Sequence, residues 1–403
     1  MKELQNLDIF RSDKVSTAVL KNAIPAMIAM LMVLIYNLAD TFFIGQTHND
    51  LLVAAVSLCT PVFLLFMAVG TIFGLGGTSV ISRAMGEGRT EYAKKVSSFC
   101  IWSCIGIGLI MSILFWVFMD QILTLMGVSI HTMEYAKSYM QIVTACGPFV
   151  LIANCCSNII RAEGQSTVAM MGMLMGNLLN VILDPIMILW FGLGIKGAAL
   201  ATVIGNVIGA AYYLLYFHKG TSMLSMNPKD FTVKDRVCRN VLLIGIPASL
   251  ASLLMSVSQI IMNSCMTQYG DMAVAGIGVA MKVTMMTGMV CIGLGQGVQP
   301  LLGYCAGAKD WTRFQKVLKF SLLFALVLSA ELTGICYLFT EQIVQAFLTD
   351  GAAFAYGFHF SRILLSTSIL FGVYYVLTNT LQAMGAATPV SYTHLTLPTI
   401  LLV

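Results

Sequence analysis

Residues 177–185 read Asn-Leu-Leu-Asn-Val-Ile-Leu-Asp-Pro and lie in the middle of an apolar run from about residue 168 to residue 191. The run is long enough to cross a bilayer, because a membrane-spanning helix needs about 20 mostly apolar residues. Asn177, Asn180 and Asp184 are spaced i, i+3 and i+7, which places them on one face of such a helix. The stretch therefore predicts a membrane-spanning helix with a polar face.

Asp184 is the residue on this face whose transfer into a bilayer costs the most free energy. A carboxylate at the centre of a bilayer costs roughly 2.5 to 3.5 kcal/mol on insertion scales, so we interpret the face as a functional site. Pro185 strengthens this interpretation, because a proline inside a helix removes one backbone hydrogen bond and leaves the Val181 carbonyl without its usual donor. The alternative that stays open is a polar packing seam, in which Asn and Asp side chains bond to a neighbouring helix.

The composition of the whole chain indicates a polytopic membrane protein. The 403 residues are 58% hydrophobic, with a mean hydropathy of +0.86 and only 10% charged residues, against about 25% charged residues in a soluble domain. The 11 cysteines show no CxxC and no Cys/His metal spacing, so we interpret them as small buried apolar residues. These properties exclude a soluble domain and a disulfide-based scaffold.

Ten stretches satisfy the length rule for membrane spans. They cover approximately residues 18–44, 52–82, 95–118, 132–160, 167–190, 196–217, 238–264, 272–304, 316–339 and 353–384. Basic residues gather in alternate connections, namely the N-terminus and the second, fourth, sixth and eighth loops. The positive-inside rule therefore predicts a cytoplasmic N-terminus.

The second half of the chain repeats the first half at an offset of about 221 residues. The matches include Gly74, Gly76 and Gly86 with Gly295, Gly297 and Gly307, Lys95 with Lys316, and Asn158, Ala162 and Gly164 with Asn379, Ala383 and Gly385. This pattern predicts an all-α protein of two six-helix lobes that share one orientation in the membrane, with a site between the lobes near mid-depth.

The repeat also suggests how the chain divides. We assign the first lobe to residues 1–218, a cytoplasmic linker to residues 219–237 and the second lobe to residues 238–389. The last stretch, residues 390–403, has no counterpart in the first half and is too short to span a bilayer. We therefore interpret it as an aberrant tail, and expect the second lobe to be incomplete, with four of its six helices.

A second acid lies in the first span. Asn37 and Asp40 occupy one face of that span, and the second half has no acid at the matching place. Tyr139 and Thr202 are candidates to bring hydroxyl groups to the same cavity, although each is also compatible with ordinary packing. A surface position for Asp40, near the end of its span, is the alternative.

These groups suit a small cation. Asp40, Asn180, Asp184 and Thr202 offer the oxygen ligands that Na⁺ prefers. Two carboxylates in one dry cavity would equally hold a proton. The sequence does not separate Na⁺ from H⁺.

Other membrane residues allow weaker hypotheses. Lys282 and Glu331 are candidates for an ion pair within the second half, or either of them for lining the cavity, and Arg362 lies near the middle of the tenth span. Met173, with its neighbouring methionines, is a candidate for an adaptable cavity wall or for simple core filling. The pairs Gly172/Gly176 and Gly205/Gly209 have the small-xxx-small spacing of close helix contacts.

Taken together, the motifs resemble those of the multidrug and toxic compound extrusion (MATE) family. The resemblance covers residues 14–388 and rests on Ile24-Pro25, Asn37-Leu-Ala-Asp40-Thr, Gly74-Leu-Gly-Gly-Thr-Ser79, Arg161-Ala-Glu-Gly164, residues 177–185 and Lys196-Gly-Ala-Ala199. It implies a twelve-helix, V-shaped protein of two lobes that exports cationic or amphipathic compounds in exchange for Na⁺ or H⁺.

The resemblance also implies roles for single residues. In the branch that this chain looks most like, the cation site of the first lobe matches Asp40, Asn180, Asp184 and Thr202, with Tyr139 nearby. Asn37, Asn177 and Met173 are the further cavity residues that we expect. Met255 and Val373 stand where another branch carries acids, which argues against a cation site in the second lobe.

Two other functions remain as alternatives. A lipid-linked oligosaccharide flippase of the same superfamily would use cavity cations such as Lys282 and Arg362 to hold pyrophosphate. An intramembrane enzyme is not expected, because the chain has no HExxH, GxSxG or paired acid–histidine constellation. We expect a monomer in the cell membrane that handles small cationic or amphipathic molecules, with no nucleic-acid partner and no cofactor besides the coupling ion.

Overall fold

The computed structural model describes residue 10 and residues 14–46, 50–128, 132–348 and 351–386, and every regular element in these ranges is a helix. The first half contains α2 (Val15–Gly45), α3 (Asp50–Gly86), α4 (Thr90–Val117), α5 (Met119–Leu125), α6 (Met133–Ala145), α7 (Gly147–Ala162), α8 (Ser166–Pro185), a π-helical turn (Ile186–Trp190) and α9 (Ile195–His218). The second half contains α10 (Val237–Met266), α11 (Asp271–Gly307), α12 (Trp311–Leu338), α13 (Thr340–Gln345), α14 (Gly351–Ser368) and α15 (Phe371–Ala383), and short 3₁₀ turns occupy Pro228–Asp230 and Thr267–Tyr269. The all-α prediction is confirmed, and the predicted tail at residues 390–403 lies outside the described residues.

The helices agree with the predicted ten membrane spans when each bent helix pair is counted as one span. In the described residues, 8 helices are long and apolar enough to cross a bilayer, and two bent pairs bring the number to 10. The pairs are α6 with α7, bent by 50°, and α14 with α15, bent by 47°. Pro148 in the first turn of α7 explains the first bend, because proline cannot continue the hydrogen bonds of α6. The chain is thus a multi-pass membrane protein.

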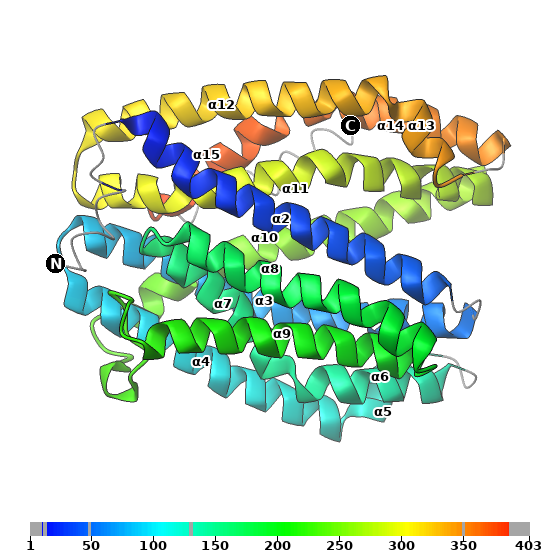
Figure 1. Cartoon of the computed structure of the whole chain (residues 1–403), viewed down its shortest axis with the longest axis horizontal. Coiled ribbons are helices and arrows are strands. Elements are labelled where there is room, and N and C mark those ends of the chain that lie inside the picture. The colour runs from blue at the N-terminus through cyan, green and yellow to red at the C-terminus, as the bar shows by residue number, and fades with distance from the viewer. Residues whose placement is uncertain (1–9, 11–13, 47–49, 129–131, 349–350, 387–403) are drawn as a thin grey trace.

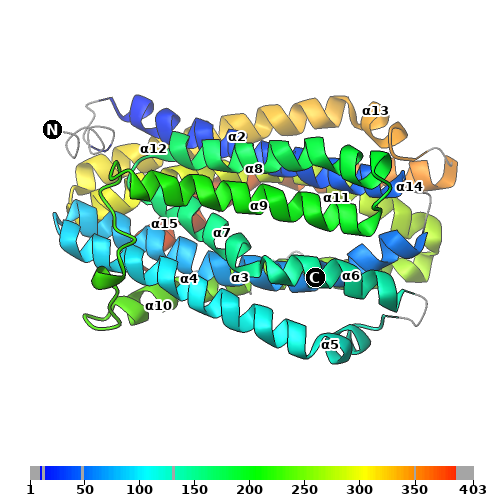
Figure 2. The same cartoon turned by 60° about the horizontal axis from the view of Figure 1, so that its bottom comes forward.

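The internal repeat is visible in the helix boundaries. Helix α3 begins at Asp50 and α11 at Asp271, while α4 ends at Val117 and α12 at Leu338, so each pair keeps the offset of 221 residues. The short helices α5 and α13, which the apolar pattern did not predict, obey the same offset. Both lie at the end of the molecule opposite the linker between α9 and α10 (Figures 1 and 2). The two halves therefore share one architecture.

Glycines join the two lobes at the end that carries the basic loops. A Cβ on Gly76 would strike the carbonyl oxygen of Val241, and one on Gly307 would strike the carbonyl oxygen of Arg83. The same close approach occurs between Gly245 and Ile72. Because these residues lie near the ends of α3 and α11 and near the start of α10, the lobes are packed backbone to backbone at this end.

Polar contacts accompany the glycines. Arg161, buried in α7, donates from Nη1 to Oε1 of Gln296 in α11 at 2.5 Å. Ser249 in α10 donates from its hydroxyl to the Ala68 carbonyl at 3.1 Å. These contacts satisfy polar groups that the closed interface removes from water.

The linker after α9 is held against the first lobe by one buried acid. Glu163, which is fully buried, accepts hydrogen bonds from the Tyr216 hydroxyl at 2.8 Å, the Ser222 hydroxyl at 2.8 Å and the Met223 N–H at 2.9 Å. Further along, the Ser97 hydroxyl donates to the Ser225 carbonyl at 2.7 Å. The linker between the lobes is therefore packed against the first lobe through specific hydrogen bonds.

Replacing Glu163 is expected to change how stability depends on pH. Burial raises the pKa of the Glu163 carboxyl from 4.5 to about 7, against the opposing effect of its hydrogen bonds. The folded state therefore binds the proton more tightly, so the stabilisation is complete below pH 4.5 and is lost as the pH rises through about 7. Between pH 4 and pH 8 the wild-type protein should lose roughly 3 kcal/mol of unfolding free energy through this group, because each unit of difference in pKa between the folded and unfolded states is worth about 1.4 kcal/mol. Melting curves of Glu163→Gln over the same pH range should not show this loss.

The control for this experiment is Glu341→Gln, since Glu341 is exposed in α13. That variant should keep the pH dependence of the wild-type protein. An identical pH dependence in Glu163→Gln and wild type would show that Glu163 does not titrate in this range.

Candidate functional site in the first lobe

Two acids from different helices lie in the half of the first lobe that is away from the closed end. Asp40 comes from α2 and is half-buried, whereas Asp184 comes from α8 and is fully buried. The charge of Asp40 acts on the Asp184 carboxyl, and both charges act on the hydroxyls of Tyr36 in α2 and Tyr139 in α6. Both carboxylates therefore lie within electrostatic range of the same two tyrosines.

Asp184 has one carboxylate oxygen with a partner and one without. With the Asn180 amide turned so that both of its ends are satisfied, its nitrogen donates to Oδ2 of Asp184 at 3.2 Å. The other oxygen, Oδ1, is buried and has no hydrogen-bond partner among the described residues. A buried anionic oxygen without a donor is costly, so this position is suited to a proton or a cation.

Asn180 connects the acid to the next helix. Its amide oxygen accepts from the Thr202 N–H at 3.0 Å, and the Thr202 hydroxyl lies 3.3 Å from the same amide. Close packing of α8 on α9 makes this contact possible, because a Cβ on Gly205 would lie 2.6 Å from the carbonyl oxygen of Gly176. The prediction that these glycines form a helix contact is confirmed.

The chain beyond Asp184 leaves the regular α-helix. Helix α8 ends at Pro185, and residues Ile186–Trp190 continue as a π-helical turn. Since proline has no N–H, the regular hydrogen-bond pattern is interrupted beside the acid, and π-turns of this kind are frequent at functional sites. Gly197 at the start of α9 fits against this turn, because a Cβ there would lie 2.7 Å from the Met187 carbonyl oxygen.

Three further cavity residues were predicted beside the acids. Asn37 is exposed, and its amide donates to the Val33 carbonyl of its own helix at 2.8 Å. Asn177 is half-buried, although Asn180 and Asp184 on the same predicted face are fully buried. Met173 accepts a contact from Nη2 of Arg161 at 3.6 Å, in a different part of the lobe.

Tyr36 is the member of the cluster that sequence reasoning missed. It lies four residues before Asp40, so a helical face drawn through the acid includes it. Its residue type gives no signal of a site, because tyrosines near the ends of membrane spans are also common in aromatic belts.

The predicted ion pair between Lys282 and Glu331 is wrong. Both side chains are exposed, and within the described ranges neither forms an ion pair. Lys282 lies instead over the ring of Phe347, 5.7 Å from its centroid. Arg362 is also exposed and stacks over Tyr337 at 4.5 Å. Both cations therefore form cation–π contacts with aromatic rings instead of ion pairs with acids.

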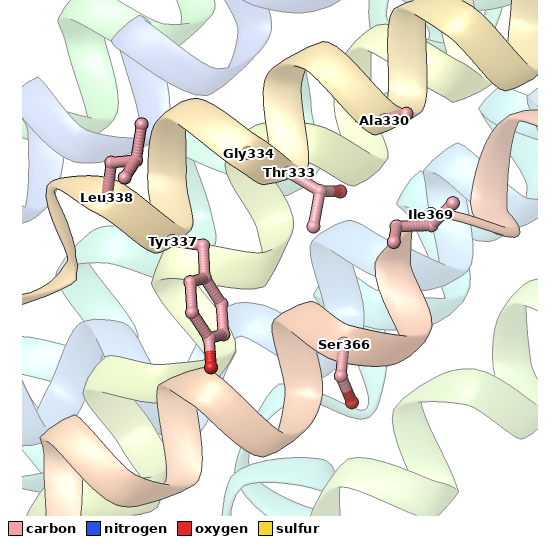
Figure 3. A pocket seen from close by; sticks show the side chains of 7 residues that line it. All are labelled: Ala330, Thr333, Gly334, Tyr337, Leu338, Ser366 and Ile369. Carbon is pink, nitrogen blue, oxygen red and sulfur yellow. The ribbon is translucent and has the colours of Figure 1, made fainter.

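A separate crevice lies in the second lobe between α12 and α14 (Figure 3). Its volume is about 560 Å³, and its lining residues are Ala330, Thr333, Gly334, Tyr337, Leu338, Ser366 and Ile369. None of these residues belongs to the predicted site, and Leu338 on its rim is 77% exposed. The side chain of Met255, at one position where acids would indicate a second-lobe cation site, lies outside the described part, and Val373 is half-buried.

The oxygen set in the first lobe fits a hard monovalent cation or a proton. It combines two carboxylates with an amide and a hydroxyl, and one buried oxygen still lacks a donor. The described residues contain no group of three or more His, Cys, Asp or Glu side chains that would hold a metal ion. The arrangement therefore suits reversible capture of a single positive charge.

Comparisons with known proteins point in one direction. The family model described as MatE matches residues 25–186 and 247–400. The multidrug export protein MepA of Staphylococcus haemolyticus is 32% identical over 385 residues, which is 96% of this chain and 85% of that protein. Among solved structures, MATE in the straight conformation superposes with a TM-score of 0.93 at 24% identity, covering 98% of this chain and 88% of that one. MATE in complex with MaD3S gives a TM-score of 0.92 at 25% identity, covering 97% and 87% of the two chains.

Proposed function

This chain belongs to the MATE family, and we propose that it is a secondary active transporter that exports cationic or amphipathic drugs in exchange for Na⁺ or H⁺. The name of the MepA relative, a multidrug export protein, supports the substrate class. Asp40 and Asp184 receive the coupling ion, Asn180 and Thr202 hold Asp184 in place, and Tyr36 and Tyr139 line the same chamber.

One observation carries the proposal. Asp184 is completely buried in a membrane-spanning helix, and its Oδ1 has no hydrogen-bond donor. A carboxylate in this setting gains much more from a bound cation or proton than an exposed one does, because water no longer stabilises its charge. A packing seam, the alternative interpretation, accounts for the Asn180 contact but not for the free oxygen.

The ion supplies energy when it moves inward. Moving one positive charge across the membrane is worth about 2.3 kcal/mol for each 100 mV, before any concentration gradient is counted. An ion shifts the balance between two states of the transporter only by as much as its affinities for those states differ. The site has to be accessible from the outer side in one state and from the inner side in the other.

The packing of the lobes fits one of these states. The glycine contacts close the end that carries the basic loops, and the acids lie in the other half of the molecule. With the N-terminus in the cytoplasm of a cell-membrane protein, as the positive-inside rule indicates, this is the outward-facing state. Ion binding at Asp40 and Asp184 in that state favours release of the exported compound.

Transport in vesicles of known composition tests this function. We expect the purified full chain, reconstituted in proteoliposomes, to move ethidium only when an opposing Na⁺ or pH gradient is imposed. The gradient that drives transport identifies the coupling ion. Ethidium movement that is absent under both gradients, in a preparation that melts cooperatively, would contradict the proposal.

The flippase alternative has little support from the cations that suggested it. Lys282 and Arg362 are exposed and lie over aromatic rings of the second lobe. The two cations come from different helices, α11 and α14, and lie over different rings, so they do not form the paired cationic site that a pyrophosphate group needs.

A further inference from the structure

A polar pocket of about 250 Å³ lies at the closed end of the molecule, apart from the acid cluster. Its walls come from the last turn of α3, the turn before α4, and the first turn of α10. Three of its lining residues are arginines, namely Arg83, Arg89 and Arg236. Such a concentration of guanidinium groups in one pocket is typical of sites that recognise phosphate.

The acids beside these arginines are already engaged. Glu87 pairs with Arg89 at 3.2 Å, and Asp235 pairs with Lys95, outside the pocket, at 3.1 Å. Arg89 also lies over the ring of Tyr92, 4.5 Å from its centroid, which orients its side chain along the wall. The charge of Glu87 also acts on Arg83, but the two carboxylates of the pocket face three arginines, so the lining keeps a net positive charge.

Arg83 and Arg236 are the cations left without an acid in the described residues. Arg83 is half-buried and donates from Nε to the Ser79 carbonyl at 3.1 Å, the one hydrogen bond of its side chain within the described ranges. Arg236 is exposed at the rim and forms no ion pair there. The pocket thus holds an excess of positive charge and free guanidinium donors.

The backbone at the rim is held in an unusual conformation. Asp235 and Arg236 have φ of 58° and 60°, two consecutive non-glycine residues in the left-handed region. That conformation costs free energy for ordinary residues and persists at sites that the surrounding structure demands. The Asn240 amide donates to the Tyr92 hydroxyl at 3.1 Å, which joins α10 to α4 behind the turn. The conformation of the rim is therefore held in place by contacts with the surrounding helices.

The depth of the pocket identifies the kind of phosphate. One candidate span ends at Gly86 and two others begin at Thr90 and Val237, so the pocket lies at the ends of three helices that are apolar enough to cross a bilayer. Lipid phosphates lie at this level of a bilayer, and basic pockets between membrane helices bind anionic head groups. We propose that this pocket binds the phosphate of an anionic phospholipid head group, through Arg83 and Arg236 with Arg89 beside them.

Occupancy of this site ties the first lobe to the chain that enters α10. Arg83 and Arg89 belong to the first lobe, whereas Arg236 lies in the linker, directly before α10. One phosphate held by arginines of the first lobe and of the linker adds a link beside the glycine contacts of the closed end. The site shares no residue with the proposed ion-coupling site, so a test of lipid binding and a test of transport can fail independently of each other.

Thermal stabilisation of the purified full chain by short-chain lipids tests the site. In detergent, dihexanoyl phosphatidylglycerol should raise the melting temperature of the wild-type protein in a saturable manner, and dihexanoyl phosphatidylcholine should not. Arg236→Gln should weaken the apparent affinity for phosphatidylglycerol about fivefold, since one basic residue near a lipid surface is worth about that factor. The matched control is Arg239→Gln, because Arg239 is an exposed arginine three residues further along, in the first turn of α10, and does not line the pocket.

The outcomes separate the sources of phosphate. Both variants are expected to melt at the wild-type temperature without lipid, because both arginines are exposed. Equal affinity of Arg236→Gln and Arg239→Gln for phosphatidylglycerol would overturn the site, as would equal stabilisation by phosphatidylcholine. Inorganic phosphate that stabilises the wild-type protein at the same concentrations as phosphatidylglycerol would overturn the lipid assignment in favour of free phosphate.

Discussion

Asp184→Asn is expected to abolish ion-driven efflux while leaving the protein at least as stable as the wild type. The substitution keeps the shape of the side chain and removes the charge that attracts the coupling ion. Because Oδ1 of Asp184 is buried without a donor, the ionised carboxylate destabilises the fold, and a neutral amide relieves that cost. We expect ethidium efflux from proteoliposomes under an imposed ion gradient to fall at least about tenfold, since without differential ion binding no gradient biases the two states.

Measuring transport and melting on the same preparation separates this role from a structural one. A residue needed only for packing would lose transport and stability together, whereas Asp184→Asn should lose transport alone. Asp120→Asn is the matched control, because Asp120 is exposed in α5 and pairs with Lys137 at 2.8 Å. Efflux of the Asp184→Asn protein at the wild-type rate would remove the acid cluster from the mechanism.

Gly76→Leu should block transport by a different route, by preventing the lobes from closing. Gly76 has no room for a Cβ, because the Val241 carbonyl of the other lobe occupies that position. A leucine there has to push α3 and α10 apart, and backbone atoms cannot move aside as a flexible side chain does. We expect efflux to fall at least about tenfold, as the closed state becomes a minor population.

The distance between the lobes provides the direct readout. Spin labels at residues 91 and 316, exposed positions on α4 and α12, should report a longer and broader distance distribution in Gly76→Leu than in the parent protein. Gly106→Leu is the control, since nothing lies within 4 Å of a Cβ at Gly106. An unchanged distance distribution with normal transport would show that this interface is not closed during the cycle.

Much of the candidate site was predictable because its determinants are local. Asn180 and Asp184 are one helical turn apart, so their shared face follows from helix geometry alone. The cost of a buried carboxylate then identifies the face as unusual without any knowledge of neighbours. Asp40 was found in the same way, from a charge inside an apolar stretch.

Relations between helices were not predictable from the same rules. Asn177 shares the predicted face with Asn180, yet it is only half-buried, because the exact rotation of α8 depends on where Gly176 meets Gly205. The ion pair assigned to Lys282 and Glu331 failed because sequence gives the depth of a charge only roughly and does not tell which aromatic ring lies beside it. The bend between α14 and α15 could not be predicted, because no proline lies at it, unlike the bend at Pro148.

The amino-acid sequence by itself determined the number of spans, the internal repeat and the acids of the first lobe, because hydropathy, a fixed offset and the cost of a buried charge are all properties of short segments. Only the tertiary structure decided that Oδ1 of Asp184 lacks a donor, that glycines close one end, and that arginines of the first lobe and of the linker surround one pocket. Each of these facts depends on atoms more than 20 residues apart in the chain, and their distance is set by packing between helices rather than by local pattern.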